Sequence, residues 1–147
     1  APAAGAATTP STTGATPAAG VGGPGPNQLF QIALDQLRRG STGAARTGFQ
    51  DLLRQYPTDE NAPEAMFYIA ETYASEGNVP SADSAYLQVV ERFPTAPRAA
   101  TALYKHALVL QQGGKTQEAR AAFQDVISRY PRSDEAALAR DRVRAAR

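Results

Sequence analysis

The side chains that could act in catalysis are few and scattered along the chain. Glu64 and Glu71 form a spaced pair of carboxylates on one predicted helix, where acid/base catalysis is formally open to them. His106 is the single histidine, so no second imidazole can join it as a ligand or catalytic partner. We expect the two carboxylates to line a polar groove wall or to face water, and His106 to pack at an edge of the core.

One glycine-containing stretch and the cysteine count complete the search for reactive groups. Gly113-Gly114-Lys115-Thr116 is similar to the end of a phosphate-binding loop, but it lacks the upstream glycine and no strand precedes it. The sequence has no cysteine, which excludes disulfides, thiolate metal sites, a cysteine nucleophile and a cysteine-linked lipid anchor within these residues. We therefore predict no catalytic residue, no cofactor and no metal, and we expect the protein not to be an enzyme.

The composition narrows the classes of partner. The 147 residues carry a net charge of +1, which implies no general affinity for polyanions and predicts no nucleic-acid partner. No apolar run approaches the roughly 20 residues that span a bilayer, so we expect no membrane insertion. The chain begins at Ala1, and we expect it to be a processed product or a fragment.

The chain divides into two regions of different character. Residues 1–26 contain alanine, glycine, proline and threonine with one serine and one valine, and no charge. Such a segment has little apolar surface to offset its ordering entropy, so we predict a disordered linker there. In residues 27–147, apolar residues recur at three- and four-residue spacings without a strand-like alternation, which predicts an all-α domain.

A repeat of 37 residues organises this second region. An aromatic residue followed by proline occurs as Tyr56-Pro57, Phe93-Pro94 and Tyr130-Pro131. Glycine is expected to end a helix at positive φ, alanine to let helices approach closely, and proline to end the second helix of each unit. The further columns at this spacing are Ala33, Ala70 and Ala107; Gly40, Gly77 and Gly114; Ala45, Ala82 and Ala119; and Phe49, Tyr86 and Phe123.

The columns predict three helical hairpins followed by a capping helix. The repeats cover about 27–61, 62–98 and 99–132, and Ser41 and Asn78 are expected to cap the second helices that follow them. In the last helix Arg140 and Arg144 occupy columns that are apolar in the repeats, as suits an end that no further repeat covers. The expected first helices lie near 28–39, 62–76 and 97–112, the second helices near 43–56, 80–93 and 116–130, and the capping helix near 133–146.

These columns resemble the tetratricopeptide repeat. Its second-helix pattern, alanine, an aromatic four residues later and proline eight residues after that, is present as Ala45, Phe49 and Pro57 and recurs in both later units. The first helix of the repeat usually carries two large residues, a small residue and an aromatic residue at fixed spacing. The second unit matches this pattern best, whereas Gln36 and His106 depart from it. The resemblance implies a superhelix of hairpins whose first helices line a concave groove that receives a segment of a partner protein.

The long spacing resembles one bacterial family more closely, the Tol-Pal accessory proteins known as YbgF or CpoB. The stretches that carry this resemblance include "YPTDENAPEAMFYIAETYASEGNVPSADSAY" and "RFPTAPRAATALYKHALVLQQGGKTQEARAAFQDVISRYPRSDEAALAR". The resemblance implies a periplasmic, non-catalytic interaction module that binds TolA and coordinates outer-membrane constriction with septal peptidoglycan synthesis. It also implies that oligomerisation would come from an N-terminal coiled coil, which these residues do not include.

The groove-lining positions of the repeat family can be assigned, residue by residue, to the predicted first helices of this sequence. Phe30, Phe67 and Tyr104 share one column and form a possible aromatic ladder along the groove, or else they pack between neighbouring helices. The predicted partner-binding positions are Asn27, Phe30, Leu34, Leu37, Arg38, Glu64, Phe67, Glu71, Ala74, Ser75, Thr101, Tyr104, Leu108, Gln111 and Gln112.

Two further alternatives remain open from the sequence. The arginines of the C-terminal edge, Arg140, Arg142, Arg144 and Arg147, form a solvated end or contact an anionic partner. The second functional hypothesis is a repeat scaffold in outer-membrane protein assembly or another envelope complex, which typically carries a lipidated cysteine and about five repeats.

Overall fold

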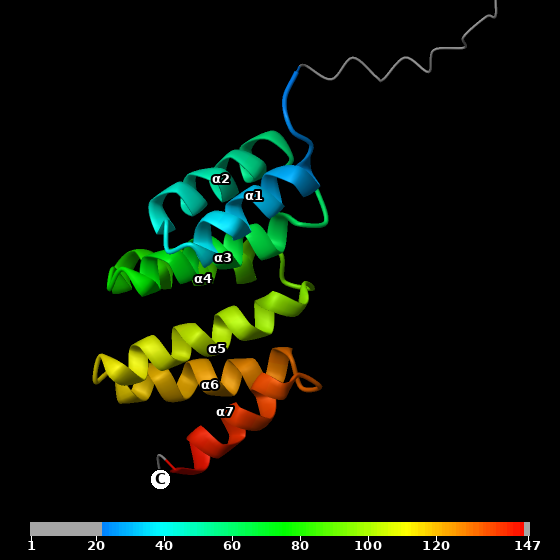
Figure 1. Cartoon of the computed structure of the whole chain (residues 1–147). Helices are drawn as coiled ribbons and strands as arrows, with labels where there is room; N and C mark the ends of the chain where they lie inside the picture. The colour runs from blue at the N-terminus through cyan, green and yellow to red at the C-terminus, as the bar shows by residue number, and fades with distance from the viewer. Residues whose placement is uncertain (1–21, 146–147) are drawn as a thin grey trace, which may run out of the picture.

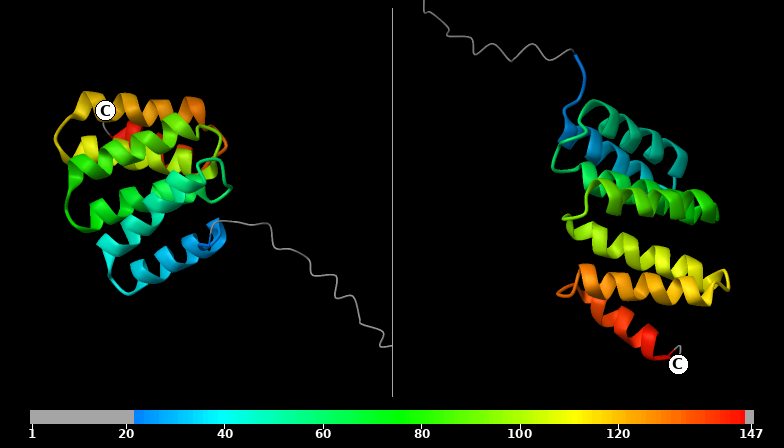
Figure 2. Two further views of the ribbon diagram at one scale, coloured as in Figure 1. Left: turned by 90° about the horizontal axis from the view of Figure 1, so that it is seen from above. Right: turned by 180° about the vertical axis from the view of Figure 1, so that it is seen from behind.

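The computed structural model describes residues 22–145, and this part of the chain is helical without strands. Its helices stack in chain order as three antiparallel pairs and a last single helix (Figures 1 and 2). Their bounds are α1 (Pro26–Arg38), α2 (Thr42–Gln55), α3 (Ala62–Ser75), α4 (Val79–Arg92), α5 (Pro97–Gln112), α6 (Thr116–Arg129) and α7 (Asp134–Ala145). The predicted hairpins and the final helix are thus present, each helix within about two residues of its expected bounds.

The predicted linker lies mostly outside the described residues. The helix α1 begins at Pro26, at the first position of the helix, where a proline fits because its missing N–H would have had no helical partner. Pro97 starts α5 in the same way, and Pro63 lies in the first turn of α3. A proline therefore lies in the first turn of each of α1, α3 and α5.

The glycine turns join the two helices of each hairpin. Gly40, Gly77 and Gly114 have φ values of 79°, 76° and 76°, a conformation that costs glycine no steric strain. At the first turn the Gly40 N–H donates to the carbonyl of Leu37 at 3.0 Å and the Ser41 N–H donates to that of Gln36 at 2.9 Å. This pair of bonds closes the helix end, and it recurs at both later glycines.

The capping expectation holds for only one of the two residues. Asn78 accepts a hydrogen bond from the Ser81 N–H at 3.3 Å, whereas Ser41 makes no side-chain bond to α2. The backbone is similar at both positions, with ψ at 76° and 67°. We attribute the difference to reach, because the amide oxygen of asparagine lies one bond further from the backbone than the hydroxyl of serine.

The proline turns join successive hairpins. Tyr56, Phe93 and Tyr130 cap the C-terminal ends of the second helices with φ between −133° and −128°. In the last of these turns the Tyr130 hydroxyl donates to the carbonyl of Pro94 at 2.8 Å. This bond connects the proline turn that ends the third hairpin to the one before it.

The core runs through the stack and is densest at the middle hairpin. The alanine columns at positions 33, 45 and their repeats are at most 2 % exposed. The helix α3 buries seven residues, while α1 buries only Ala33. In α7, Ala136 and Ala139 are buried and Arg140 is exposed, so this helix closes the end of the stack as expected.

The glycine turns yield a direct test by substitution. Replacing Gly77 with alanine is expected to lower the free energy of unfolding by about 1 kcal/mol, because a Cβ is strained at positive φ. The matched control is Gly43→Ala in α2, where an added Cβ would meet nothing within 4 Å and a helical alanine is favoured by up to about 1 kcal/mol. Urea unfolding measures both, and equal effects of the same sign would contradict this account.

Candidate functional site

We call α1, α3, α5 and α7, which begin their units, the first helices, and α2, α4 and α6 the second helices. Within the described residues α3 contacts α5 and α5 contacts α7, while no comparable contact joins α2 with α4 or α4 with α6. From α3 to α7 the stack is therefore closer together on the side of the first helices than on the side of the second helices. We call these two sides the first-helix face and the second-helix face.

The predicted groove positions differ in their exposure to solvent. Phe67 is buried with 4 % of its surface exposed. The exposed positions are Asn27, Arg38, Ala74, Ser75, Gln111 and Gln112, and the half-buried positions are Phe30, Leu34, Leu37, Glu64, Glu71, Thr101, Tyr104 and Leu108.

The aromatic column is not uniform along the first-helix face. The Phe67 ring lies 6.0 Å from the Tyr86 ring, and the guanidinium of Arg98 lies 4.5 Å above it. Phe30 and Tyr104 are half-buried, each against the aromatic residue of its own second helix, with ring centroids 5.7 Å and 5.6 Å apart. Phe67 therefore packs as a core residue, which leaves Phe30 and Tyr104 as the rings that reach solvent.

Polar side chains join successive first helices at a constant offset of 34 residues. The Asn61 side-chain amide donates to Asn27 at 2.6 Å, and the Thr101 hydroxyl donates to Glu135 at 2.7 Å. Between these two, Arg98 Nε donates to Glu64 Oε2 at 2.6 Å. The predicted positions Asn27, Glu64 and Thr101 thus bind neighbouring helices of the chain itself.

Sequence reasoning missed the partners in these contacts, Asn61, Arg98 and Glu135. These three residues also stand 37 positions apart along the sequence. The signal was a second polar column, but its pairing with the first depends on the tilt between hairpins. The bond to Glu64 raises the pKa of the Arg98 guanidinium above its usual value, so Arg98 stays charged.

Glu71 is the centre of a second polar contact. It accepts a hydrogen bond from the Tyr86 hydroxyl and pairs with Lys105 Nζ at 2.7 Å. Burial and this hydrogen bond raise the pKa of Tyr86 far above its ordinary value, so the phenol stays protonated as a donor. Glu64 and Glu71 are therefore each held by a cation, and they line the wall between α3 and α5.

His106 and the glycine-lysine stretch have structural surroundings. The Nδ1 atom of His106 lies 2.6 Å from an Asp83 carboxylate oxygen, which ties α5 to α4. Gly114 has positive φ in the turn between α5 and α6, and Thr116 begins α6. Among residues 22–145 no group of three or more potential metal ligands occurs.

A different interhelical contact lies where the first hairpin meets the second. Glu76, at the end of α3, accepts from Thr42 Oγ1 at 2.7 Å and from Arg46 at 2.6 Å. The hydroxyl of Thr42, together with Arg46, lowers the pKa of the Glu76 carboxyl. The guanidinium of Arg46 also lies 4.1 Å over the Tyr73 ring. These side chains fill the space between α2 and the end of α3.

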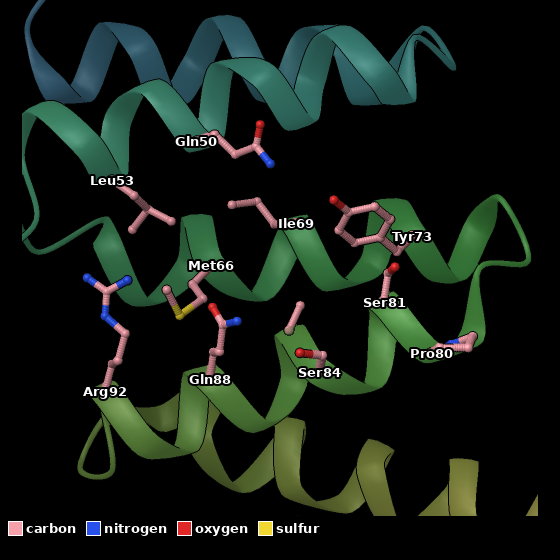
Figure 3. A pocket seen from close by; sticks show the side chains of 11 residues that line it. Gln50, Leu53, Met66, Ile69, Tyr73, Pro80, Ser81, Ser84, Gln88 and Arg92 are labelled. Carbon is pink, nitrogen blue, oxygen red and sulfur yellow. The ribbon is translucent and has the colours of Figure 1, made fainter.

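The second-helix face is hollowed between neighbouring hairpins, a feature that sequence reasoning missed. A groove of about 500 Å³ lies between α2 and α4 on a floor of Met66, Ile69 and Tyr73 of α3. Figure 3 shows the side chains that line it. A second groove, of about 960 Å³, lies between α4 and α6 on a floor of Leu103, His106 and Leu110. Each floor residue of the second groove stands 37 positions after its counterpart in the first, so the two hollows are repeats of one another.

The family comparison is decided by one match over most of the chain. The YfiO family, described as outer membrane lipoprotein, matches residues 24–147. The chain belongs to the YfiO family. The match covers all three hairpins and α7. Comparison with curated protein sequences gives no significant match.

Solved structures share the fold at low sequence identity. The Yersinia enterocolitica type III secretion chaperone SycD, in complex with a peptide of the translocator YopD, has a TM-score of 0.66 at 18 % identity, over 82 % of this chain and 90 % of that one. The first TPR of Spaghetti (RPAP3), bound to an HSP90 peptide, has a TM-score of 0.61 at 16 % identity, covering 82 % and 89 %. The predicted tetratricopeptide-repeat architecture is confirmed.

Two longer neighbours show the same fold in larger chains. MamA RS-1, as a double mutant, has a TM-score of 0.63 at 22 % identity over 82 % of this YfiO-family chain. The chain spans 63 % of that protein and 40 % of a repeat protein from Parabacteroides merdae.

Within residues 22–145, every helix is too short or too polar to cross a membrane.

The burial of Phe67 predicts a large loss of stability on truncation. Phe67→Ala should lower the free energy of unfolding by about 3–5 kcal/mol, because it leaves a cavity between α3, α4 and the Arg98 side chain. Gln112→Ala, an exposed change at the end of α5, should alter it by about 0.5 kcal/mol or less. Urea unfolding of both variants tests this, and a Phe67→Ala variant as stable as the parent would place the ring outside the core.

Proposed function

We propose that the protein is a non-catalytic interaction module of the bacterial cell envelope that holds a segment of a partner protein on its first-helix face. Membership of the YfiO family, described as outer membrane lipoprotein, supports the location in the cell envelope. The peptides bound to the SycD and Spaghetti structures support the mode of binding, since both share this fold. Repeat proteins of this kind use their extended concave surfaces to bind partners.

The observation that carries the proposal is the distribution of charged and apolar side chains on the first-helix face. The charged groups at its centre are paired with each other, as Glu64 with Arg98 and Glu71 with Lys105. Half-buried apolar side chains stand on both sides of this centre, Leu34 and Leu37 with Phe30 on α1, and Leu108 with Tyr104 on α5. A partner segment would gain most of its binding energy by covering these apolar groups.

The proposed partner is a TolA-like periplasmic protein, and the proposed location is the periplasm. The support is the sequence resemblance to the YbgF/CpoB family, in which such a domain serves the Tol-Pal system and cell division. A second candidate is a scaffold for outer-membrane protein assembly. The description of the matched family as an outer membrane lipoprotein favours this second candidate, and both share the same binding face.

Calorimetric titration with the periplasmic part of TolA tests the proposal. Leu108→Ala should weaken binding about tenfold, because truncating an apolar anchor that carries binding energy costs more than about 1 kcal/mol. The matched control is Ile32→Gln on α1, which changes a side chain that is 46 % exposed and belongs to the column that floors the grooves of the opposite face. Circular dichroism first confirms that both variants are folded.

The outcomes separate the candidates. Binding that weakens in Leu108→Ala and not in Ile32→Gln supports both the partner and the face. Binding that is unchanged in Leu108→Ala contradicts the first-helix face as the site. Absence of binding to TolA removes that partner and leaves the assembly scaffold, for which the same variants are compared in capture of envelope proteins.

A further inference from the structure

The groove between α4 and α6 continues into a second hollow and forms a trough along the second-helix face. The hollow of about 960 Å³ between α4 and α6 adjoins one of about 650 Å³ near the glycine turn of the third hairpin. Leu87 of α4 and Leu110 of α5 line both. We call these two adjoining hollows the α4–α6 trough.

The trough exposes apolar side chains that the fold does not cover. Leu87 is 38 % exposed and Val79, at the start of α4, is 48 % exposed. They are two of the four large hydrophobic residues that stand most open to solvent in residues 22–145. An apolar surface in a hollow with a polar rim is typical of a binding site for another protein.

The rim of the trough is acidic. Glu91 of α4 and Glu118 of α6 line it, and neither has an ion-pair partner among the described residues. Asp125 lies on the same wall and is paired with Arg129 at 3.5 Å. The second hollow adds Asp83, which contacts His106, and Lys115. The trough thus has more carboxylates than lysines and arginines, while the whole chain carries a net charge of +1.

The corresponding groove of the preceding repeat lacks both features. A shift of 37 residues replaces Leu87 by Gln50 and Glu118 by Ser81, on the same backbone arrangement. Neither the exposed leucine nor the acidic rim is thus required for two hairpins to pack. The chemistry of the α4–α6 trough is particular to this junction.

The hollow near the glycine turn of the third hairpin is open because the second and third hairpins lack the side-chain contact that fills the corresponding space between the first two hairpins. Between the first two hairpins, Arg46 pairs with Glu76 and covers the Tyr73 ring. The residues 37 positions later are Asp83, Gly113 and Leu110, which provide neither a long cation nor a carboxylate at the helix end. A hollow lined by Val79, Leu87, Val109 and Leu110 together with Asp83 and Lys115 remains where the preceding junction has a charged contact.

We propose that the α4–α6 trough binds a basic amphipathic segment of a partner protein. Its apolar side would cover Leu87, Val79 and Leu110, and its lysines or arginines would face Glu91 and Glu118. This charge complementarity selects the partner and accelerates its association. The chain's own residues 1–26 do not have this chemistry, since they carry no charge and a single valine as their largest apolar residue.

A pair of designed peptides tests the proposal on the whole chain. One labelled peptide of about 14 residues, roughly the length of α4, combines leucine on one helical side with lysine on the other. Its matched partner replaces every lysine with glutamate. Fluorescence anisotropy should show binding of the lysine peptide, weakening with salt as ion contacts are screened, and at least about tenfold weaker binding of the glutamate peptide.

Substitutions copied from the preceding groove place the site. Leu87→Gln and Glu118→Ser should each weaken binding of the lysine peptide about tenfold or more, because each removes a central contact. Both substitutions change exposed positions, so the fold should persist. Ile32→Gln, an exposed apolar change on α1, and Leu108→Ala, on the opposite face, should leave this affinity unchanged.

Three results would overturn the proposal. They are equal binding of the two peptides, unchanged binding by Leu87→Gln and Glu118→Ser, and a parent chain that sediments as a dimer which Leu87→Gln dissociates. The last result would assign the trough to a second copy of the chain. Because Leu108→Ala tests the first-helix face, failure of this proposal and failure of the proposed function give different patterns.

Discussion

The rest of the structure depends on one constraint, which is that a single helical hairpin of this sequence has more apolar surface than it can bury by itself. The helix α3 shows this most clearly, since its seven buried residues are covered by α2 and α5 as well as by its own partner α4. At the open end of the stack α1 buries only Ala33. Stacking is therefore a condition of folding, and it creates both the first-helix face and the grooves behind it.

The parts of the fold that could be predicted from the sequence are those in which one residue type satisfies a local backbone demand. Gly77 is an example, because its positive φ of 76° is open to few other residues. Phe67 marks the limit of such reasoning. It shares a column with Phe30 and Tyr104, but it is buried because Arg98 of the next hairpin covers it, and that cover depends on the tilt between hairpins.

The two faces show how a repeat can keep its backbone while its surfaces diverge. On the first-helix face, a polar contact recurs at each junction with different chemistry, from Asn27 and Asn61 to Glu64 and Arg98. On the second-helix face, the columns that give Gln50 in one groove give Leu87 in the next. Function therefore has to be argued from the individual junctions, since the shared architecture alone does not distinguish them.

The most direct test of the central claim compares the whole chain with its isolated third hairpin, residues 96–130, by circular dichroism and urea unfolding. The account predicts that the whole chain unfolds with a cooperative transition, while the isolated hairpin has little helix and no transition, because its apolar face is uncovered. An isolated hairpin with helix content per residue and cooperativity equal to those of the whole chain would contradict the claim that stacking holds the fold together.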